Sequence, residues 1–158
     1  MRVRKATVED LANVALLHRR SILELCNTHY SPEQLTEWTS ALKLSSYAKL
    51  LASHEMFVAD DGEALLGFCV LNANAGFINA TYVNPNANSR GVGRALMTAA
   101  EAAARNKGLT EIRLHATLNS VGFYERLGYA RGESATNRLP SGTELPCVVM
   151  SKNLHQQL

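Results

Sequence analysis

Apolar positions spaced three and four residues apart predict helices in the first third of the chain. A short strand is expected over residues 3–6, and Thr7 follows it as a helix N-cap with Asp10 at the third helical position, an approximate capping box. The first helix is predicted to extend to about Cys26, because apolar residues recur at helical spacing within it: Leu11, Val14, Ala15, Ile22 and Leu25.

Two more helices are predicted after a polar and aromatic loop over residues 27–30. Ser31 is a suitable N-cap, with proline in the first turn and Gln34 at the third position. Residues 44–52 have the pattern of another short helix. Trp38 is expected in the core or in the wall of a pocket.

Runs rich in β-branched and aromatic residues predict strands in the middle of the chain. Residues 56–59 and 65–71 are two strands joined by the strong turn sequence Asp60-Asp61-Gly62. A second turn over residues 72–76 leads to a strand over residues 77–83. Three strands joined by such short turns predict an antiparallel meander.

A loop rich in Asn, Ser and Gly follows these strands and leads into a helix dense in alanine over residues 95–107. Gly108 is predicted to end this helix. The next strand, over residues 112–116, is expected to run parallel to the preceding strand, because the helix between them makes a crossover.

The C-terminal part is predicted to contain one short helix and a strand pair. Asn119 can cap a helix over residues 120–127. Strands over residues 129–131 and 147–150 are joined through a turn at residues 139–142. The predicted order of elements is therefore β-α-α-α-β-β-β-α-β-α-β-β, one mixed α/β sheet.

Length and composition suit a single domain over residues 1–158, with 46% apolar and 19% charged residues. A net charge of +2 is too small to favour a nucleic-acid or membrane partner. No apolar run reaches the roughly 18 residues of a membrane helix, and the N-terminus lacks the apolar core of a signal peptide. We therefore expect a cytoplasmic protein, with three thiols used as small apolar side chains: Cys26, Cys69 and Cys147.

The segment over residues 83–96 has the composition of an anion-binding turn between a strand and a helix. Gly91 and Gly93 allow unusual dihedral angles and close approach of a ligand. The first amides of a helix lack partners and carry partial positive charge, and Arg90 and Arg94 add full charges. The third glycine of the dinucleotide fingerprint and the Gly-Lys-Ser/Thr of the Walker loop are both missing. The remaining readings are a phosphate site of another kind and a plain tight turn.

Two segments of the chain resemble the GCN5-related N-acetyltransferase family. The first is Val83-x-Pro85 followed by Arg90-Gly91-Val92-Gly93-Arg94-Ala95-Leu96, and the second is Phe123-Tyr124-Glu125-Arg126-Leu127-Gly128-Tyr129. In the loop pattern of the family, Gln/Arg-x-x-Gly-x-Gly/Ala, Asn88 replaces the first residue and both glycines are kept. The order of elements is similar to that of the family over about residues 2–151.

The resemblance implies that the loop binds the pyrophosphate of acetyl-coenzyme A through its backbone amides. It also implies that the sheet splays between the strands ending near Val83 and Ala116, so that the pantetheine arm lies in the gap. A backbone amide of the strand ending at Val83 would meet the thioester carbonyl. The cofactor-binding residues implied in this way are Tyr82, Val83, Asn88, Ser89, Arg90, Gly91, Val92, Gly93, Arg94 and Asn119.

The resemblance also implies direct transfer of the acetyl group to a primary amine in a ternary complex. Tyr124 matches the tyrosine of the family that assists the departing thiolate; the alternative is an ordinary buried aromatic residue. The pKa of a phenol is about 10 and that of a thiol about 8.5, so full proton transfer from tyrosine is unfavourable. We therefore expect Tyr124 to donate a hydrogen bond.

Many members of the family have a carboxylate on the strand before the loop that acts as the general base. This chain has no acid on that strand. Asn79 on that strand cannot take a proton but could orient water, and His115 on the adjacent strand is either the base or a structural histidine. Glu24 and His29 are weaker candidates for this role. The residues expected to shape the acceptor pocket are Cys26, His29, Tyr30 and Asn79. No metal is expected, because Cys26 and His29 lack further ligands at suitable spacing.

The missing acid suggests a hypothesis about the acceptor. A lysine-type amine, with a pKa of about 10.4, is neutral at roughly one part in a thousand near neutral pH. An α-amine, with a pKa of about 7.7–8.0, is neutral in tens of percent. An enzyme without a strong base would act more easily on the α-amine.

We therefore predict an acetyl-coenzyme A-dependent N-acetyltransferase that acts on a small-molecule or peptide amine, and for which a homodimer is plausible. One alternative is a sensor or interaction module that binds acyl-coenzyme A without turnover. Another is a generic nucleotide-binding domain.

Overall fold

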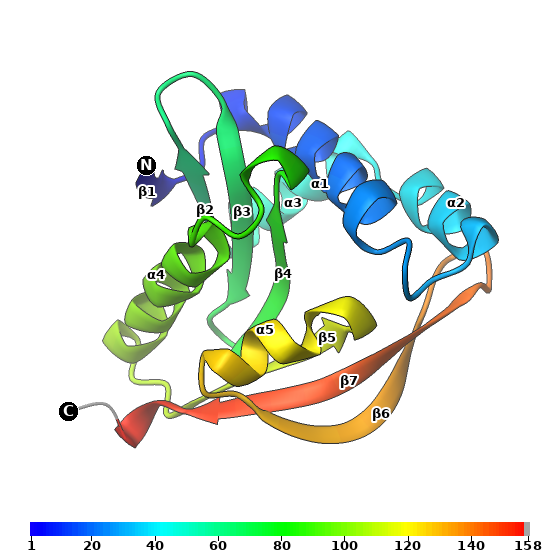
Figure 1. Cartoon of the computed structure of the whole chain (residues 1–158). Helices are drawn as coiled ribbons and strands as arrows, with labels where there is room; N and C mark the ends of the chain where they lie inside the picture. Colours follow the sequence, from blue (N-terminus) through cyan, green and yellow to red (C-terminus); the bar gives the residue numbers. More distant parts are fainter. Residues whose placement is uncertain (157–158) are drawn as a thin grey trace.

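A twisted seven-stranded sheet forms the frame of the protein, shown in Figure 1 as a computed structural model that describes residues 1–156. The strands lie in the order β1-β2-β3-β4-β5-β7-β6. Among these described strands β4 and β5 are parallel neighbours, and the other neighbouring pairs are antiparallel. The predicted mixed sheet and antiparallel meander are confirmed. The strands are β1 (Arg2–Lys5), β2 (Glu55–Asp60), β3 (Leu65–Asn72), β4 (Phe77–Val83), β5 (Glu111–Thr117), β6 (Ala130–Arg138) and β7 (Glu144–Asn153).

Within the described residues, five α-helices pack on the two faces of the sheet. Along β2, Met56 and Val58 belong to a core cluster with α1 and α3, whereas Phe57 and Ala59 belong to a cluster with α4. The sequences of β2 and β3 are nearly continuous apolar runs, which is typical of strands that are buried on both faces. The helices are α1 (Leu11–Leu25), α2 (Pro32–Ser40), α3 (Leu44–Ser53), α4 (Val92–Asn106) and α5 (Val121–Arg126).

The approximate capping box predicted at Thr7 is present, and the predicted Ser31 cap also forms a capping box. The Gln34 amide donates to Ser31 Oγ at 3.1 Å, and the Ser31 amide donates to the Gln34 side chain at 2.9 Å. The Thr7 amide donates to Asp10 Oδ2 at 2.8 Å. The chain makes one 3-10 turn there, Val8–Asp10, before α1 begins. The predicted start was therefore correct in place and differs only in the type of its first turn.

The boundaries of α4 and α5 differ from the prediction. Helix α4 begins at Val92 rather than at residue 95, because Gly91 takes a left-handed conformation with φ of 79° and is the N-cap. A 3-10 turn, Leu118–Ser120, precedes the short helix α5. Asn119 lies inside this turn and Ser120 is at the N-cap position, so the predicted capping role of Asn119 was wrong.

The last two strands are longer than the predicted residues 129–131 and 147–150. They pair from Ala130↔Ser151 to Arg138↔Glu144, with an irregularity after Arg131. Almost all of β6 is exposed and polar, so it lacks the apolar alternation from which strands are predicted. Hydrogen bonding to β7 decides its length.

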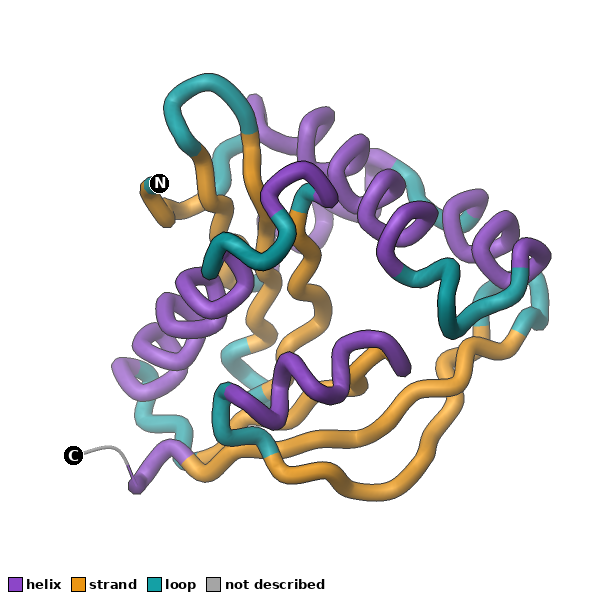
Figure 2. Tube along the Cα trace, in the orientation of Figure 1, coloured by secondary structure: helices purple, strands orange, loops and turns teal. Residues whose placement is uncertain are grey.

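Strands β4 and β5 separate soon after they meet. They pair at Phe77↔Arg113 and Ile78↔Leu114 and then diverge, as the trace in Figure 2 shows. On the other side of β4 the register with β3 shifts at Asn79, which forms a β-bulge. The predicted splay between these strands is confirmed. The bulge was not predicted.

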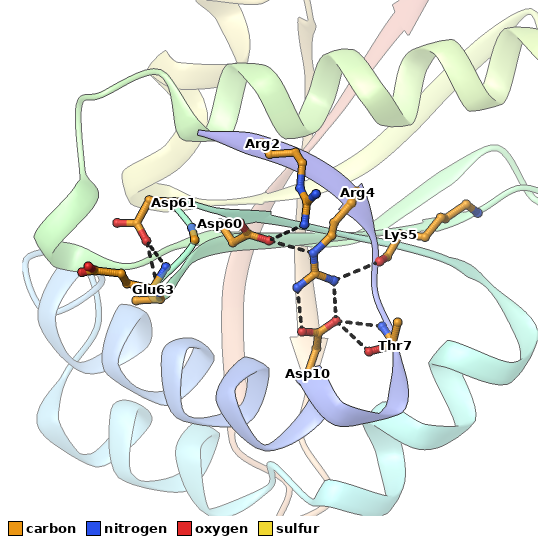
Figure 3. Close-up of polar contacts among 10 residues, drawn as sticks. Arg2, Arg4, Lys5, Thr7, Asp10, Asp60, Asp61 and Glu63 are labelled. Carbon is orange, nitrogen blue, oxygen red and sulfur yellow. Dashed lines mark hydrogen bonds and ion pairs between the residues drawn. The ribbon is translucent and has the colours of Figure 1, made fainter.

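One arginine between two carboxylates fixes the N-terminal strand (Figure 3). Arg4 Nε donates to Asp60 Oδ2 at 2.7 Å, and the two terminal nitrogens of Arg4 donate to the Asp10 oxygens at 2.8 and 3.0 Å. The Arg4 guanidinium holds the pKa of Asp10 below its ordinary value. This cluster joins β1, the first 3-10 turn and β2.

We expect Asp10→Asn to lower the free energy of unfolding by about 1–2 kcal/mol at pH 7, because charged hydrogen bonds with Arg4 are lost while the amide oxygen can still accept from Thr7. The pKa of Asp10 is depressed in the folded state, so its contribution is present above the ordinary value of 3.8 and is lost as pH falls through the lower folded value. Urea unfolding at pH 7 and pH 3 should therefore show a smaller difference between wild type and variant at pH 3.

Glu24→Gln is the matched control, since Glu24 forms an exposed ion pair with Arg20 within one helix. Its effect should stay within about 0.5 kcal/mol at both pH values. An effect of Asp10→Asn that is equal at pH 7 and pH 3 would show that charge at Asp10 does not stabilise the fold.

Candidate active site

Two cavities meet where β4 and β5 separate. The first has a volume of about 530 Å³ and is lined from the starts of α4 and α5 and the end of α1. The second has a volume of about 370 Å³ and is lined mainly from β4, β5, β7 and the first two helices. Tyr82 and Thr117 line both cavities. The two cavities are therefore neighbours at the split, with these two residues between them.

Two residues with positive φ shape the loop before α4: Ser89 at 69° and Gly91 at 79°. Backbone turns of this kind group N–H donors into a concave anion site, and the first amides of the helix are free to join them. Arg90 is not among the described residues that line the first cavity, and its guanidinium donates to the Asn86 carbonyl at 3.0 Å. The loop residues that do line it are Asn88, Ser89, Gly91, Val92, Gly93 and Arg94.

The two glycines of the loop are required for different reasons. A Cβ at Gly91 would meet nothing within 4 Å, so the positive φ is what favours glycine there. A Cβ at Gly93 would lie 2.8 Å from Cζ of Phe123. Close approach of a ligand was predicted at both glycines, but at Gly93 the near neighbour is a ring of α5. Glycine therefore lets α5 pack against α4.

Tyr124 lines the first cavity from α5 and is only 6% exposed. Burial raises the pKa of its phenol above the ordinary value, and a hydrogen bond with Thr81 offsets part of this effect. The Tyr124 hydroxyl therefore keeps its proton at neutral pH. It can donate a hydrogen bond to a group in the cavity.

Asn119 and Cys26 meet in the wall of the first cavity. The Asn119 side chain makes a hydrogen bond with the Cys26 thiol, yet its Oδ1 is buried and has no partner among the described residues. Burial raises the pKa of Cys26 to about 11, so the thiol is neutral. The unpaired Oδ1 is an acceptor that a ligand N–H would satisfy.

His115 lines the second cavity from β5 and is held by a residue that the sequence did not point to. Its Nδ1 lies 3.1 Å from Oδ1 of Asn137 on β6. Because Oδ1 is an acceptor, Nδ1 donates this hydrogen bond, and the neutral tautomer that does so has its lone pair on Nε2. The Phe77 ring lies edge-on to His115, with 5.2 Å between ring centroids.

Tyr30 ties the loop after α1 to the far side of the split. Its hydroxyl donates to the Pro146 carbonyl at 2.6 Å and accepts from the Leu118 amide at 3.0 Å. Of the predicted acceptor residues, Tyr30 and Asn79 line the second cavity, whereas Cys26 and His29 line the first. These four residues were predicted to shape one acceptor pocket, but the structure divides them between two cavities.

A buried histidine backs the ring of Tyr82. The ring centroids of His18 and Tyr82 are 4.2 Å apart, and His18 Nδ1 lies 2.8 Å from the Tyr47 hydroxyl. Burial lowers the pKa of His18 to about 3, so its ring is neutral. His18 was not predicted as a site residue, because it occupies an ordinary core position on its own helix.

The described residues hold neither a metal-binding cluster nor a membrane-spanning helix. Within residues 1–156, no group of three or more His, Cys, Asp or Glu side chains is arranged to hold a metal ion. No helix in that range has the length and apolar character needed to cross a membrane.

A family model and a partial relative match the chain. The model, described as an acetyltransferase (GNAT) domain, matches residues 26–141, more than half of the sequence. An aminoglycoside N(6′)-acetyltransferase type 1 from Klebsiella aerogenes is 38% identical over 96 residues. This match covers 54% of the present chain and 58% of the Klebsiella protein.

Solved structures have the same fold. A GCN5-related N-acetyltransferase from Rhodopseudomonas palustris is 28% identical and superimposes with a TM-score of 0.91, covering 96% of this chain and 94% of that one. The PaiA N-acetyltransferase from Thermoplasma acidophilum, solved in complex with coenzyme A, has a TM-score of 0.76. The PaiA comparison covers 96% and 98% of the two chains at 22% identity, and it supports the fold alone.

We expect Gly93→Ala to destabilise the protein by about 1–3 kcal/mol, because the new methyl group must displace the Phe123 ring. Phe123→Leu should relieve the clash. In a double-mutant cycle measured by urea unfolding, Gly93→Ala should therefore cost less, by at least about 0.5 kcal/mol, when Phe123→Leu is already present. Equal costs in both backgrounds would show that Phe123 does not set the need for glycine.

Proposed function

The chain belongs to the GNAT acetyltransferase family, and we propose that it transfers an acetyl group from acetyl-coenzyme A directly to a primary amine. The observation that carries this proposal is a pair of cavities at the split that share two lining residues, Tyr82 and Thr117. Tyr124 lines the cavity on one side of the split, and His115 lines the cavity on the other. A thioester in the first cavity and an amine in the second would meet there.

The first cavity has the donors and the charge that a pyrophosphate requires. The start of α4 and the two positive-φ residues before it supply backbone N–H groups. Arg94 and Arg126 line the same cavity, and no Asp or Glu of the described residues does so. We assign pyrophosphate binding to residues 88–94, with Arg90 contributing through its backbone.

The pantetheine arm has two suitable partners. Beyond Ile78, β4 has no paired strand on the side of β5. Because Asn84 bonds to β3 and backbone groups alternate along a strand, the Val83 backbone groups face the split and are open to an extended ligand. The buried Oδ1 of Asn119 lacks a partner among the described residues, and an amide N–H of pantetheine would satisfy it. Both features fit coenzyme A.

In the proposed reaction the amine nitrogen bonds to the thioester carbonyl carbon, and the carbon–sulfur bond breaks. The sulfur leaves as a thiolate that then takes a proton, and the new nitrogen–carbon product loses a proton to a base. Tyr124 donates a hydrogen bond to the leaving sulfur. Because burial raises the pKa of Tyr124, transfer of its proton would be unfavourable, whereas hydrogen bonding is not.

His115 is the proposed base, and Asn137 is the proposed positioning residue. With Nδ1–H bonded to Asn137 Oδ1, the lone pair of Nε2 is left to accept the proton of the attacking amine. This tautomer is fixed by a strand other than that of His115. Asn79, in the bulge of β4, lines the same cavity and is suited to orient a water molecule.

A thiol-release assay with a panel of primary amines tests the proposal. Tyr124→Phe should lower kcat by roughly tenfold to a thousandfold while the Kd of coenzyme A, measured by calorimetry, stays similar. Tyr129→Phe is the matched control, because it removes a buried tyrosine hydroxyl that bonds to Glu101 outside the cavity. Unchanged turnover by Tyr124→Phe would remove Tyr124 from the mechanism. Coenzyme A binding without thiol release by wild type would favour a binding module.

His115→Ala should lower kcat by roughly tenfold to a hundredfold, because the variant removes the proposed proton acceptor. The affinity for coenzyme A should not change, since His115 lines the other cavity. His54→Ala is the control, since His54 lies at the end of α3 and bonds to Ser53. A kcat for His115→Ala equal to that of the control would exclude His115 as the base.

A further inference from the structure

We infer that the acceptor is a small amine with an apolar or aromatic body, a single amino group and no carboxylate, bound in the second cavity. The inference rests on the proposed function and goes beyond it, because it names the class of acceptor. It depends on the apolar side chains that line the cavity and on the lack of charged side chains among its described lining residues.

The walls of the second cavity are mainly aromatic and aliphatic. Tyr30, Trp38 and Tyr82 supply rings from three different elements, and Trp38 and Tyr30 are 8% and 5% exposed. Their arrangement is fixed: the Tyr30 and Trp38 ring centroids are 5.4 Å apart at 69°, and those of Trp38 and Tyr82 are 6.5 Å apart. Leu139 and Leu145 continue the apolar wall. An apolar body would gain burial here.

No charged side chain of Asp, Glu, Lys or Arg lines this cavity among the described residues. Burial also keeps His18 neutral, with a pKa lowered to about 3. A sugar with several ammonium groups would therefore lose hydration and gain no counter-ion, and a free amino acid would leave its carboxylate unpaired. The lining therefore does not favour an aminoglycoside acceptor, although the chain is similar over 96 residues to an aminoglycoside N(6′)-acetyltransferase.

The polar side chains of the cavity other than His18 sit where β4 and β5 separate: His115 with Asn137, Thr117 and the bulged Asn79. Thr117 also lines the first cavity, as Tyr82 does, so the polar part reaches the thioester site beside the Tyr82 ring. An amine placed there has its apolar body directed to the rings. The volume of about 370 Å³ is at the small end of the usual range for ligand pockets, ~300–1,000 Å³.

Trp38 makes binding measurable without turnover, because it is the one tryptophan in the sequence. Its fluorescence would be titrated with five probes: L-phenylalaninamide, phenethylamine, L-phenylalanine, glycinamide and kanamycin. We expect saturable changes with the first two and none with the other three at equal concentration. Phenylalanine differs from its amide by the carboxylate, and glycinamide differs by the ring, so each part of the inference has its own control.

The same probes would then be compared by thiol release from acetyl-coenzyme A. We expect kcat/KM for L-phenylalaninamide to exceed those for glycinamide, phenylalanine and kanamycin by at least tenfold. Phenethylamine should be slower than the amide near pH 7, because less of it is neutral. Kanamycin or glycinamide equal to the amide would overturn the inference and leave the proposed function standing. Selective changes in Trp38 fluorescence without any thiol release would overturn the proposed function and leave the inferred class of ligand standing.

A pair of variants that differ only in charge tests the role of the uncharged wall. Leu139→Asp places a carboxylate in it, and Leu139→Asn is the neutral match. We expect the ratio of kcat/KM for cadaverine over phenethylamine to be at least tenfold higher in the Asp variant than in the Asn variant. Equal ratios would show that the missing charge does not select the acceptor.

Discussion

The parting of β4 and β5 after two paired positions is the constraint on which the rest of the site depends. A strand edge in a protein interior must find partners for its N–H and C=O groups. Beyond Ile78 and Leu114 these two strands no longer supply them to each other. The bulge at Asn79 adds a bend at the same place. The fold thus leaves an open stretch of backbone between two cavities, which suits an extended ligand.

A sheet that opens in its middle needs other contacts to hold its halves together. Three groups of contacts provide them. Glu101 on α4 accepts from Lys152 Nζ of β7 at 2.9 Å and from the Tyr129 hydroxyl at 2.8 Å. The Tyr30 hydroxyl joins the loop after α1 to β7 and to the turn before α5. The ring of Phe123 lies against the start of α4. The width of the split is therefore set by buried side chains from both halves.

The two cavities differ in charge, and this difference suits them to different ligands. Helix-start amides and two arginines surround the first, which suits an anion. Aromatic and aliphatic side chains form most of the second, and no fixed charge of the described residues lines it. In the proposed reaction an anionic acetyl donor and an uncharged amine approach from these opposite environments. Tyr82 and Thr117, which line both, mark the place where they meet.

Signals between residues close in the chain were enough to predict the order of elements, the capped helix starts, and the loop and Phe-Tyr segments that indicate the family. Long-range contacts produced the features that these signals did not predict: Asn137 holds His115, Asn79 forms a bulge, β6 is long and polar, and no charged side chain of the described residues lines the second cavity. Each of these features depends on which side chains and strands from distant segments meet. Local periodicity carries no information about such meetings. The sequence therefore indicated the loop and Tyr124 of the first cavity and only some residues of the second, Tyr30, Asn79 and His115.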